Sequence, residues 1–104
     1  MTPPAGLFRW DDHELDKVTE MVSRKEIGVA GQALVQTYLK KGARVPQHAH
    51  PGAQWIYVLQ GALDVSVSGQ PTITVREGDV LYVPAESLHQ AEARDDTFVL
   101  DVRT

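Results

Sequence analysis

Apolar and polar residues alternate along several short segments of this chain. Within residues 62–68, Leu63, Val65 and Val67 occupy every second position and are separated by aspartate and serine. Side chains of an extended strand point alternately to its two faces, so this segment presents one apolar face for a core and one polar face for solvent. The pattern predicts a half-buried β-strand.

Similar segments recur along the chain and are bounded by glycine, proline or acidic residues. The segments 69–71 and 77–79 read Gly-Gln-Pro and Glu-Gly-Asp and predict turns. Pro84 ends a further apolar run, because proline cannot donate to a strand ladder. We therefore expect an all-β fold. Strands are predicted at residues 19–24, 32–39, 54–60, 62–68, 72–75, 80–83, 88–94 and 97–102.

One domain is expected, because 104 residues leave room for a single compact unit, which we assign to residues 17–104. Residues 1–16 contain two prolines, a glycine and an acidic pair, and are expected to form a loosely structured N-terminal arm. Leu7, Phe8 and Trp10 are the residues expected to hold that arm against the domain.

Residues 15–22 also allow a helical interpretation. Leu15, Val18 and Val22 lie near helical spacing, which makes a short helix the alternative to a strand. Thr19, a β-branched residue, and the glycines that follow favour the strand.

Composition and charge exclude several classes of protein. The absence of cysteine excludes disulfides, thiolate zinc sites and a cysteine nucleophile. A net charge of −4 argues against nucleic acid as a partner. No segment approaches the roughly 20 apolar residues of a membrane span, and the N-terminus lacks the pattern of a signal peptide. We therefore expect a cytoplasmic protein that binds neither nucleic acid nor a membrane.

Metal-ligand residue types are concentrated between Gly42 and Gly61, a segment that reads G-x5-H-x-H-x3-Q-x6-G. The histidines are His48 and His50, and the amide is Gln54. Residues two apart in an extended segment point to the same side, so both imidazoles can face one point, and Gln54 shares their parity. Gln54 has an alternative role as a structural amide that satisfies backbone groups.

A fourth ligand is expected from a distant segment. His89 is the candidate, because it follows Pro84 and shares a face with Ala91 and Ala93, whose small side chains leave space around an imidazole. We expect one divalent transition-metal ion per chain, and these donors suit zinc, nickel, iron, manganese or cobalt. His13 has no such companions and is interpreted as a surface residue.

These two blocks resemble the two cupin motifs, G-x5-H-x-H-x3,4-E-x6-G and G-x5-P-x-G-x2-H-x3-N. The resemblance covers residues 42–93, half of the chain. Gln54 stands where the family usually has glutamate, Glu86 where it has glycine and Ala93 where it has asparagine. The resemblance implies an RmlC-like double-stranded β-helix, a jelly-roll barrel of two antiparallel sheets that holds a metal with three histidines and a carboxylate or amide.

Asp101 lies between apolar residues of the last predicted strand, so it faces either solvent or the interior. The chain end around it resembles that of small cupins that linearise 4,5-unsaturated uronates, in which three histidines, a glutamine and an aspartate form the site. An inward Asp101 would transfer protons, with Tyr38, Tyr82 or Arg103 as orienting groups.

Three imidazoles and an amide are neutral ligands, so a bound ion would keep its 2+ charge and attract anions. We therefore expect an enzyme that isomerises or opens the ring of a small anionic hydroxy- or oxo-acid. The alternatives are a non-enzymatic module that binds or senses a small molecule or a metal, and a metal-dependent dioxygenase.

A homodimer is expected from residues 55–59, which read Trp-Ile-Tyr-Val-Leu and are therefore apolar on both faces of one strand. The small size of the domain also favours association, because a short chain buries a modest fraction of its surface.

Overall fold

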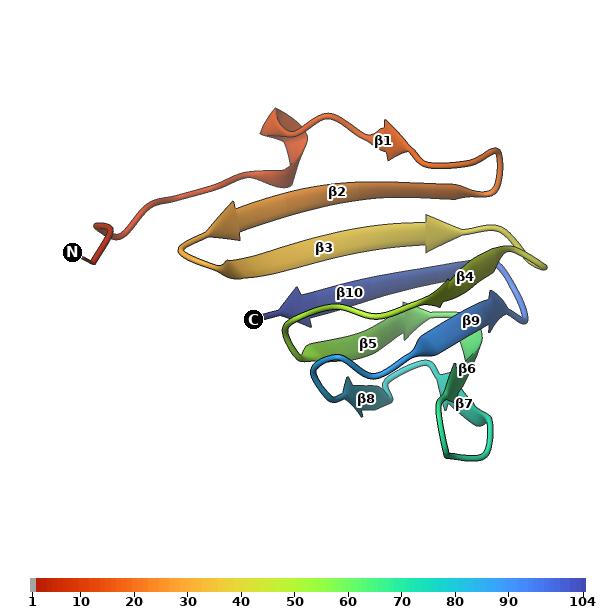
Figure 1. Cartoon of the computed structure of the whole chain (residues 1–104). Helices are drawn as coiled ribbons and strands as arrows, with labels where there is room; N and C mark the ends of the chain where they lie inside the picture. The colour runs from red at the N-terminus through yellow and green to blue at the C-terminus, as the bar shows by residue number, and fades with distance from the viewer. Residues whose placement is uncertain (1) are drawn as a thin grey trace.

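The computed structural model describes residues 2–104, which form one short 3-10 helix and ten strands (Figure 1). The elements are η1 (Trp10–Asp12), β1 (Asp16–Lys17), β2 (Val22–Val29), β3 (Gln32–Leu39), β4 (Arg44–His48), β5 (Gln54–Gln60), β6 (Ala62–Val67), β7 (Ile73–Arg76), β8 (Val80–Val83), β9 (His89–Ala93) and β10 (Thr97–Arg103).

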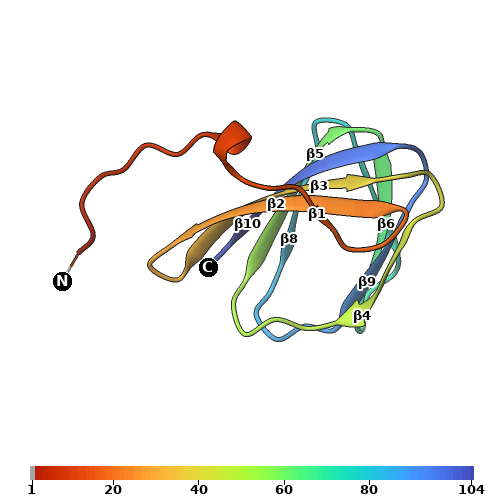
Figure 2. The ribbon, with the colours of Figure 1, turned by 90° about the horizontal axis from the view of Figure 1, so that it is seen from above.

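The strands form two sheets that face each other, as the view in Figure 2 shows. A six-stranded sheet has the order β1-β2-β3-β10-β5-β8, and a four-stranded sheet has the order β4-β9-β6-β7. Every pair of neighbouring strands is antiparallel. The predicted all-β fold of two antiparallel sheets is confirmed.

The core lies between the sheets and consists mainly of valine. In β6, Leu63, Val65 and Val67 are buried, whereas Asp64 and Ser66 lie on the other face, as the alternation predicts. Val58 of the larger sheet is fully buried in the same cluster, and Val35 of that sheet is also fully buried. Burying β-branched side chains between two sheets supplies the main favourable term of folding for such a barrel.

Several strands have the predicted bounds, notably those at 32–39, 54–60 and 80–83. The strand expected at 19–24 begins later, at Val22, and continues to Val29. The helix considered for residues 15–22 does not form, because β1 pairs with β2 and the chain must reverse tightly between them. The backbone amide of Val18 donates to the carbonyl of Val22 at 2.9 Å and closes this reversal.

The N-terminal segment extends away from the barrel (Figure 2). Leu7 and Phe8 were expected to hold this segment against the sheets, but they are 76% and 51% exposed and do not do so. The contact comes from a polar group: Lys25 Nζ donates to the carbonyl oxygen of Trp10 at 3.0 Å. Within residues 2–104, no helix has the length and apolar character needed to cross a membrane.

Candidate metal centre and active site

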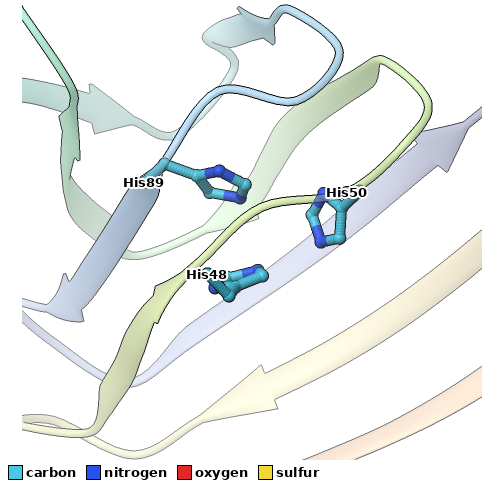
Figure 3. A group of neighbouring side chains, drawn as sticks. All are labelled: His48, His50 and His89. Atoms are coloured by element: carbon cyan, nitrogen blue, oxygen red, sulfur yellow. The ribbon is translucent and has the colours of Figure 1, made fainter.

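Three histidines meet at one end of the four-stranded sheet (Figure 3). His48 is the last residue of β4, His50 lies in the loop that follows, and His89 is the first residue of β9. One ring nitrogen from each lies within 4.8 Å of the others. The ring centroids of His48 and His89 are 4.3 Å apart, and His50 is 4.6 Å from His48 and 4.9 Å from His89. The structure thus brings together all three histidines predicted from the sequence.

Strand pairing positions two of the imidazoles. β4 and β9 are antiparallel, and His48 is directly opposite His89, so both side chains lie on the same face of the sheet. The pairing shifts between Val45 and His48, next to Pro46, which lacks a backbone donor. His50 follows two residues beyond the end of β4 and turns its ring toward the other two, as Figure 3 shows.

Backbone carbonyls fix which nitrogen of two rings is free. His48 Nδ1 donates to the carbonyl of Pro46 and His89 Nδ1 donates to the carbonyl of Ser87, both at 2.8 Å. A carbonyl oxygen only accepts, so each Nδ1 carries the proton and each Nε2 keeps its lone pair. Metal-binding histidines are commonly oriented in this way. The buried His89 Nε2 has no hydrogen-bond partner among the described residues, as expected for an atom placed to ligate a metal.

A turn at residues 84–87 supports two of the histidines. The Ser87 amide donates to the Pro84 carbonyl at 3.4 Å, and the Glu86 amide donates to the His50 carbonyl at 2.7 Å. Glu86 has a φ of +62°, in the left-handed region that usually favours glycine. This is the position at which the cupin motif has glycine, so the turn keeps the backbone shape with a different residue.

The larger sheet contributes three more polar groups to the same cavity. Gln54 begins β5 and is 4% exposed, and Asp101 of β10 is 6% exposed. Arg103 lies opposite Gln54, and its Nη2 is 3.8 Å from Asp101 Oδ2. Within residues 2–104, Gln54 Oε1, Asp101 Oδ1 and Arg103 Nε are buried without a hydrogen-bond partner.

Unpaired buried polar atoms are costly, so their convergence indicates a place for a bound group. The donors suit a divalent transition metal, since imidazole nitrogen and amide oxygen are neutral ligands of intermediate softness. His48, His50, His89 and Gln54 are the residues that would hold it. An inward-facing Asp101 is one of the two orientations that the sequence leaves open.

Burial favours the neutral form of His50 and of His89. Desolvation lowers the pKa of His50 to about 4, and the charge of Arg103 and the two other histidines acts in the same direction. Burial also lowers the pKa of His89, although the hydrogen bond to the Ser87 carbonyl opposes this shift. Neutral imidazole is the form that ligates metals, so both rings are ready to bind at neutral pH.

Asp101 has the opposite shift. Burial raises the pKa of its carboxyl group to about 6, while Arg103, a hydrogen bond from the Gln54 side chain, Arg24 and His48 act to lower it. A carboxyl group with a pKa near the working pH can both accept and donate a proton.

The histidines and the buried polar groups line one cavity of about 360 Å³, a size that suits a small molecule. Three arginines line it, and Asp101 is its one acidic lining residue among the described residues. The arginines are Arg24, Arg44 and Arg103. The rest of the wall is mostly apolar and includes Val22, Leu39, Ile56, Leu63, Val65, Ala91 and Val99.

The structure does not bring the two tyrosines to this cavity. Tyr38 is exposed on the outer face of β3, where it stacks on Phe98 at 4.4 Å between ring centroids. Its neighbours Thr37 and Leu39 face the cavity instead, because adjacent residues of a strand point to opposite faces. Tyr82 is likewise exposed on β8. The expectation that Tyr38 or Tyr82 orients Asp101 is therefore wrong, because neither lines the cavity.

Arg24 is a cavity residue that the sequence interpretation missed. It belongs to β2, and its side chain is 38% exposed and only 4.0 Å from Asp16, at the limit of an ion pair. Its parity with the buried Val22 is the signal that would have identified it as inward-facing.

Comparison with known proteins agrees with the geometry. Residues 35–102 match the family model described as the cupin domain. This chain belongs to the cupin family. Curated protein sequences give no match to this cupin.

The cupin superposes along almost its whole length on solved structures. KdgF from Halomonas sp. is 26% identical, with a TM-score of 0.84 over 96% of this chain and 93% of that chain. An RmlC-like cupin from Shewanella frigidimarina is 24% identical, with a TM-score of 0.84 over 99% and 93%. Oxalate decarboxylase from Bacillus subtilis, a protein with Mn(II) centres, is 23% identical, with a TM-score of 0.87 over 99% of this chain and 30% of that chain.

Proposed function

We propose that this cupin is a metal-dependent enzyme that isomerises or opens the ring of a small anionic hydroxy- or oxo-acid. The observation that carries the proposal is the placement of the buried Asp101 carboxyl group, with one unpaired oxygen, in the cavity lined by the three histidines. His48, His50, Gln54 and His89 would hold zinc, nickel, iron, manganese or cobalt. A bound ion would supply Lewis acidity toward a substrate oxygen.

The charges of the cavity wall favour an anionic ligand. Arg24 and Arg103 bring two positive charges to a cavity with one carboxyl group, whereas Arg44, at the cavity edge, has Glu92 on the outer face of the smaller sheet as its partner. Arg103 is partly neutralised by Asp101, whereas Arg24 has only the exposed and loosely placed Asp16 as a partner. A guanidinium group can bind a substrate carboxylate through two parallel hydrogen bonds, which would orient the acid as well as attract it.

Asp101 is suited to the proton transfer that such a reaction needs. An isomerisation moves a proton from one atom of the substrate to another atom of the same molecule, so it needs no external oxidant or reductant. One carboxyl group that takes the proton and returns it is sufficient. The apolar wall around Asp101 limits competition from water, which would otherwise exchange the proton.

One observation favours a second candidate function. Asp101 and Arg103 form an ion pair within the cavity, so the carboxyl group has a structural partner as well as a free oxygen. If Asp101 serves only to hold Arg103, the barrel is a module that binds a small anion without changing it.

Turnover separates the two candidates. The resemblance of the site to cupins that linearise 4,5-unsaturated uronates makes these uronates the first substrates to test, followed by other small oxo-acids. Protein loaded with each metal would be incubated with each acid and followed by proton NMR. We expect Asp101→Asn to retain metal but to lose turnover by about 10²- to 10⁴-fold.

Asp95→Asn is the matched control, because Asp95 is an exposed acid in the loop that precedes β10. Its turnover should equal that of the unaltered protein. Anion binding without conversion of any acid tested would instead support the binding module, and full turnover by Asp101→Asn would remove Asp101 from the reaction.

A further inference from the structure

The cavity has a second polar region besides the group of histidines, Gln54 and Asp101. Arg24 of β2 and Thr37 of β3 are directly opposite each other in the strand ladder, and both line the cavity. Thr19, in the reversal between β1 and β2, lines it as well. We call these three residues the distal end. It offers a guanidinium group and two hydroxyl groups, which can all donate hydrogen bonds to a carboxylate.

Strand register sets the separation between the distal end and Asp101. Asp101 is on β10, and the sheet order β2-β3-β10 places it two strands away from Arg24. Thr37, the partner of Arg24, is opposite Val99, so Arg24 is also displaced from Asp101 by two residues along the strands. Strands about 4.8 Å apart and a rise of about 3.4 Å per residue put the Cα atoms of Arg24 and Asp101 about 12 Å apart. The two charged groups therefore belong to different parts of one cavity.

Apolar side chains separate the distal end from Asp101. Val99 lies opposite Thr37 and two residues before Asp101, and it is buried. Val22 and Leu39 also line the cavity, each two residues from a member of the distal end along its strand. A charged group of a ligand would lose its hydration against this wall without gaining a partner, whereas a carbon chain would not. The cavity thus suits a molecule with a polar group at each end.

Arg24 is only weakly paired within the protein. Its Nε is 4.0 Å from Asp16 Oδ2, and the Asp16 side chain is 70% exposed. Such an exposed ion pair contributes little, because water screens it and both side chains lose conformational freedom by forming it. Arg103, by contrast, lies beside the buried carboxyl group of Asp101. Of these two cavity arginines, Arg24 therefore has the guanidinium group that is freer to bind a ligand.

We propose that Arg24 binds the carboxylate of the substrate at the distal end and so selects acids by their length. The proposal rests on the proposed function only in taking the metal centre and Asp101 as the reacting end. An acid with adjacent carbonyl and carboxylate groups would place both at the metal and leave Arg24 unused. An acid with several carbons between these groups can reach both ends, and it gains the paired hydrogen bonds of a guanidinium–carboxylate contact.

Binding of a series of ω-oxo acids tests this selection. Glyoxylate, 4-oxobutanoate and 6-oxohexanoate each carry one aldehyde and one carboxylate group, at increasing separation. Their affinities would be measured by calorimetry on protein loaded with zinc, which has no redox chemistry. Arg24→Gln should weaken binding of 6-oxohexanoate by about 30-fold or more, because it removes one partner of a charge pair. Glyoxylate should change by less than about threefold, since a charge this distant is largely screened.

Two further variants separate carboxylate binding from a structural role. Arg24→Lys keeps the charge but lacks the planar pair of donors, so it should recover part of the lost affinity for 6-oxohexanoate. Asp16→Asn is the matched control, because it removes the ion-pair partner of Arg24 and leaves the cavity residue in place. It should bind all three acids as the unaltered protein does, and circular dichroism should show the same β-structure in every variant.

Three outcomes would overturn the proposal. If Asp16→Asn and Arg24→Gln weakened 6-oxohexanoate equally, Arg24 would serve to hold β1 rather than a ligand. If Arg24→Gln changed the affinity for all three acids by the same factor, Arg24 would not distinguish their lengths. Failure of every acid to bind would also contradict it. Calorimetry records binding and not turnover, so acids that bind through Arg24 but are never converted would contradict the proposed enzyme and leave this selection intact.

Discussion

Gln54 decides the charge of the proposed metal centre. With three imidazoles it forms a neutral set of donors, whereas the glutamate that the cupin motif usually has at this position would add one negative charge. Among the described residues, its Oε1 is buried without a hydrogen-bond partner, and its side-chain amide donates a hydrogen bond to Asp101. An amide can ligate a metal through its oxygen and donate to Asp101 through its nitrogen, whereas an ionised carboxylate can only accept hydrogen bonds.

Gln54→Glu tests this role through two opposed effects. We expect metal affinity, measured by competition with a chelator, to increase about tenfold or more, because a carboxylate would place a negative charge about 2 Å from the ion. Binding of anionic acids, measured by calorimetry on the metal-loaded protein, should weaken. Gln60→Glu, at the exposed end of the same strand, should change neither. Unaltered metal retention together with full affinity for anions would show that Gln54 is not a ligand.

His48 and His50 could be predicted from sequence because their spacing brings both side chains to one side, and His89 because it follows Pro84 and shares a face with two alanines. Asp101 could not be placed, because parity separates it from an apolar face of Phe98, Leu100 and Val102 but does not say which face of β10 is inward. Tyr38 was misplaced for the same reason: Leu34, Val35 and Leu39 put apolar groups on both faces of β3. The outer face of the larger sheet accounts for this ambiguity, because its exposed Leu34, Tyr38, Trp55 and Tyr82 form a second apolar surface outside the core.

At the scale of elements, the turn at residues 84–87 retains a left-handed backbone conformation although Glu86 replaces the glycine of the cupin motif. Glu86 adopts a left-handed conformation that costs a non-glycine residue about 1–2 kcal/mol. The same turn presents the Ser87 carbonyl to His89 and the Glu86 amide to the His50 carbonyl. The backbone of the turn is therefore fixed by its contacts with the site.

Glu86→Gly should relieve this strain. The gain is offset by the greater freedom of glycine in the unfolded chain, so we expect the free energy of unfolding to rise by about 0.5–1 kcal/mol net. Urea denaturation measures the change. Glu77→Gly is the control: Glu77 lies in an exposed turn and does not have a positive φ, so it should lose about 0.5–1 kcal/mol. Equal losses in the two variants would contradict the assignment of strain to residue 86.

Strands with strict alternation or a clear bounding turn were predictable, and those without either were not. β4 is absent from the predicted strands because Arg44, Pro46 and Gln47 give it a polar and interrupted pattern. It forms because β9 offers it a paired neighbour on the smaller sheet. The start of β2 was also misjudged, since the reversal after β1 is set by pairing with β2 rather than by a glycine or proline.

At the scale of the whole molecule, the candidate ligands connect both layers of the barrel. His48 and His89 belong to the four-stranded sheet, whereas Gln54 belongs to the six-stranded sheet. An ion bound by all of them would link segments that are far apart in the sequence and that separate on unfolding.

Metal addition should therefore stabilise the fold. At a metal concentration about 100 times the dissociation constant, the expected gain is about 2.7 kcal/mol, which for a chain of this size raises Tm by about 10 °C or more. Differential scanning calorimetry of chelator-treated and metal-loaded protein measures the shift. His89→Ala should abolish it, and His13→Ala, in the N-terminal segment, should leave it unchanged. Identical melting curves with and without metal would argue against a site that links the two sheets.

Two parts of the chain form the cavity wall, one inside and one outside the matched cupin domain. The histidines, Gln54 and Asp101 all lie within the matched cupin domain, residues 35–102, whereas four other lining residues precede it: Val18, Thr19, Val22 and Arg24. The proposed metal centre and this part of the wall therefore belong to different segments of the chain. Exchanging residues 16–24 between cupins would be a way to retarget the barrel to a new acid while its metal-binding residues stay as they are.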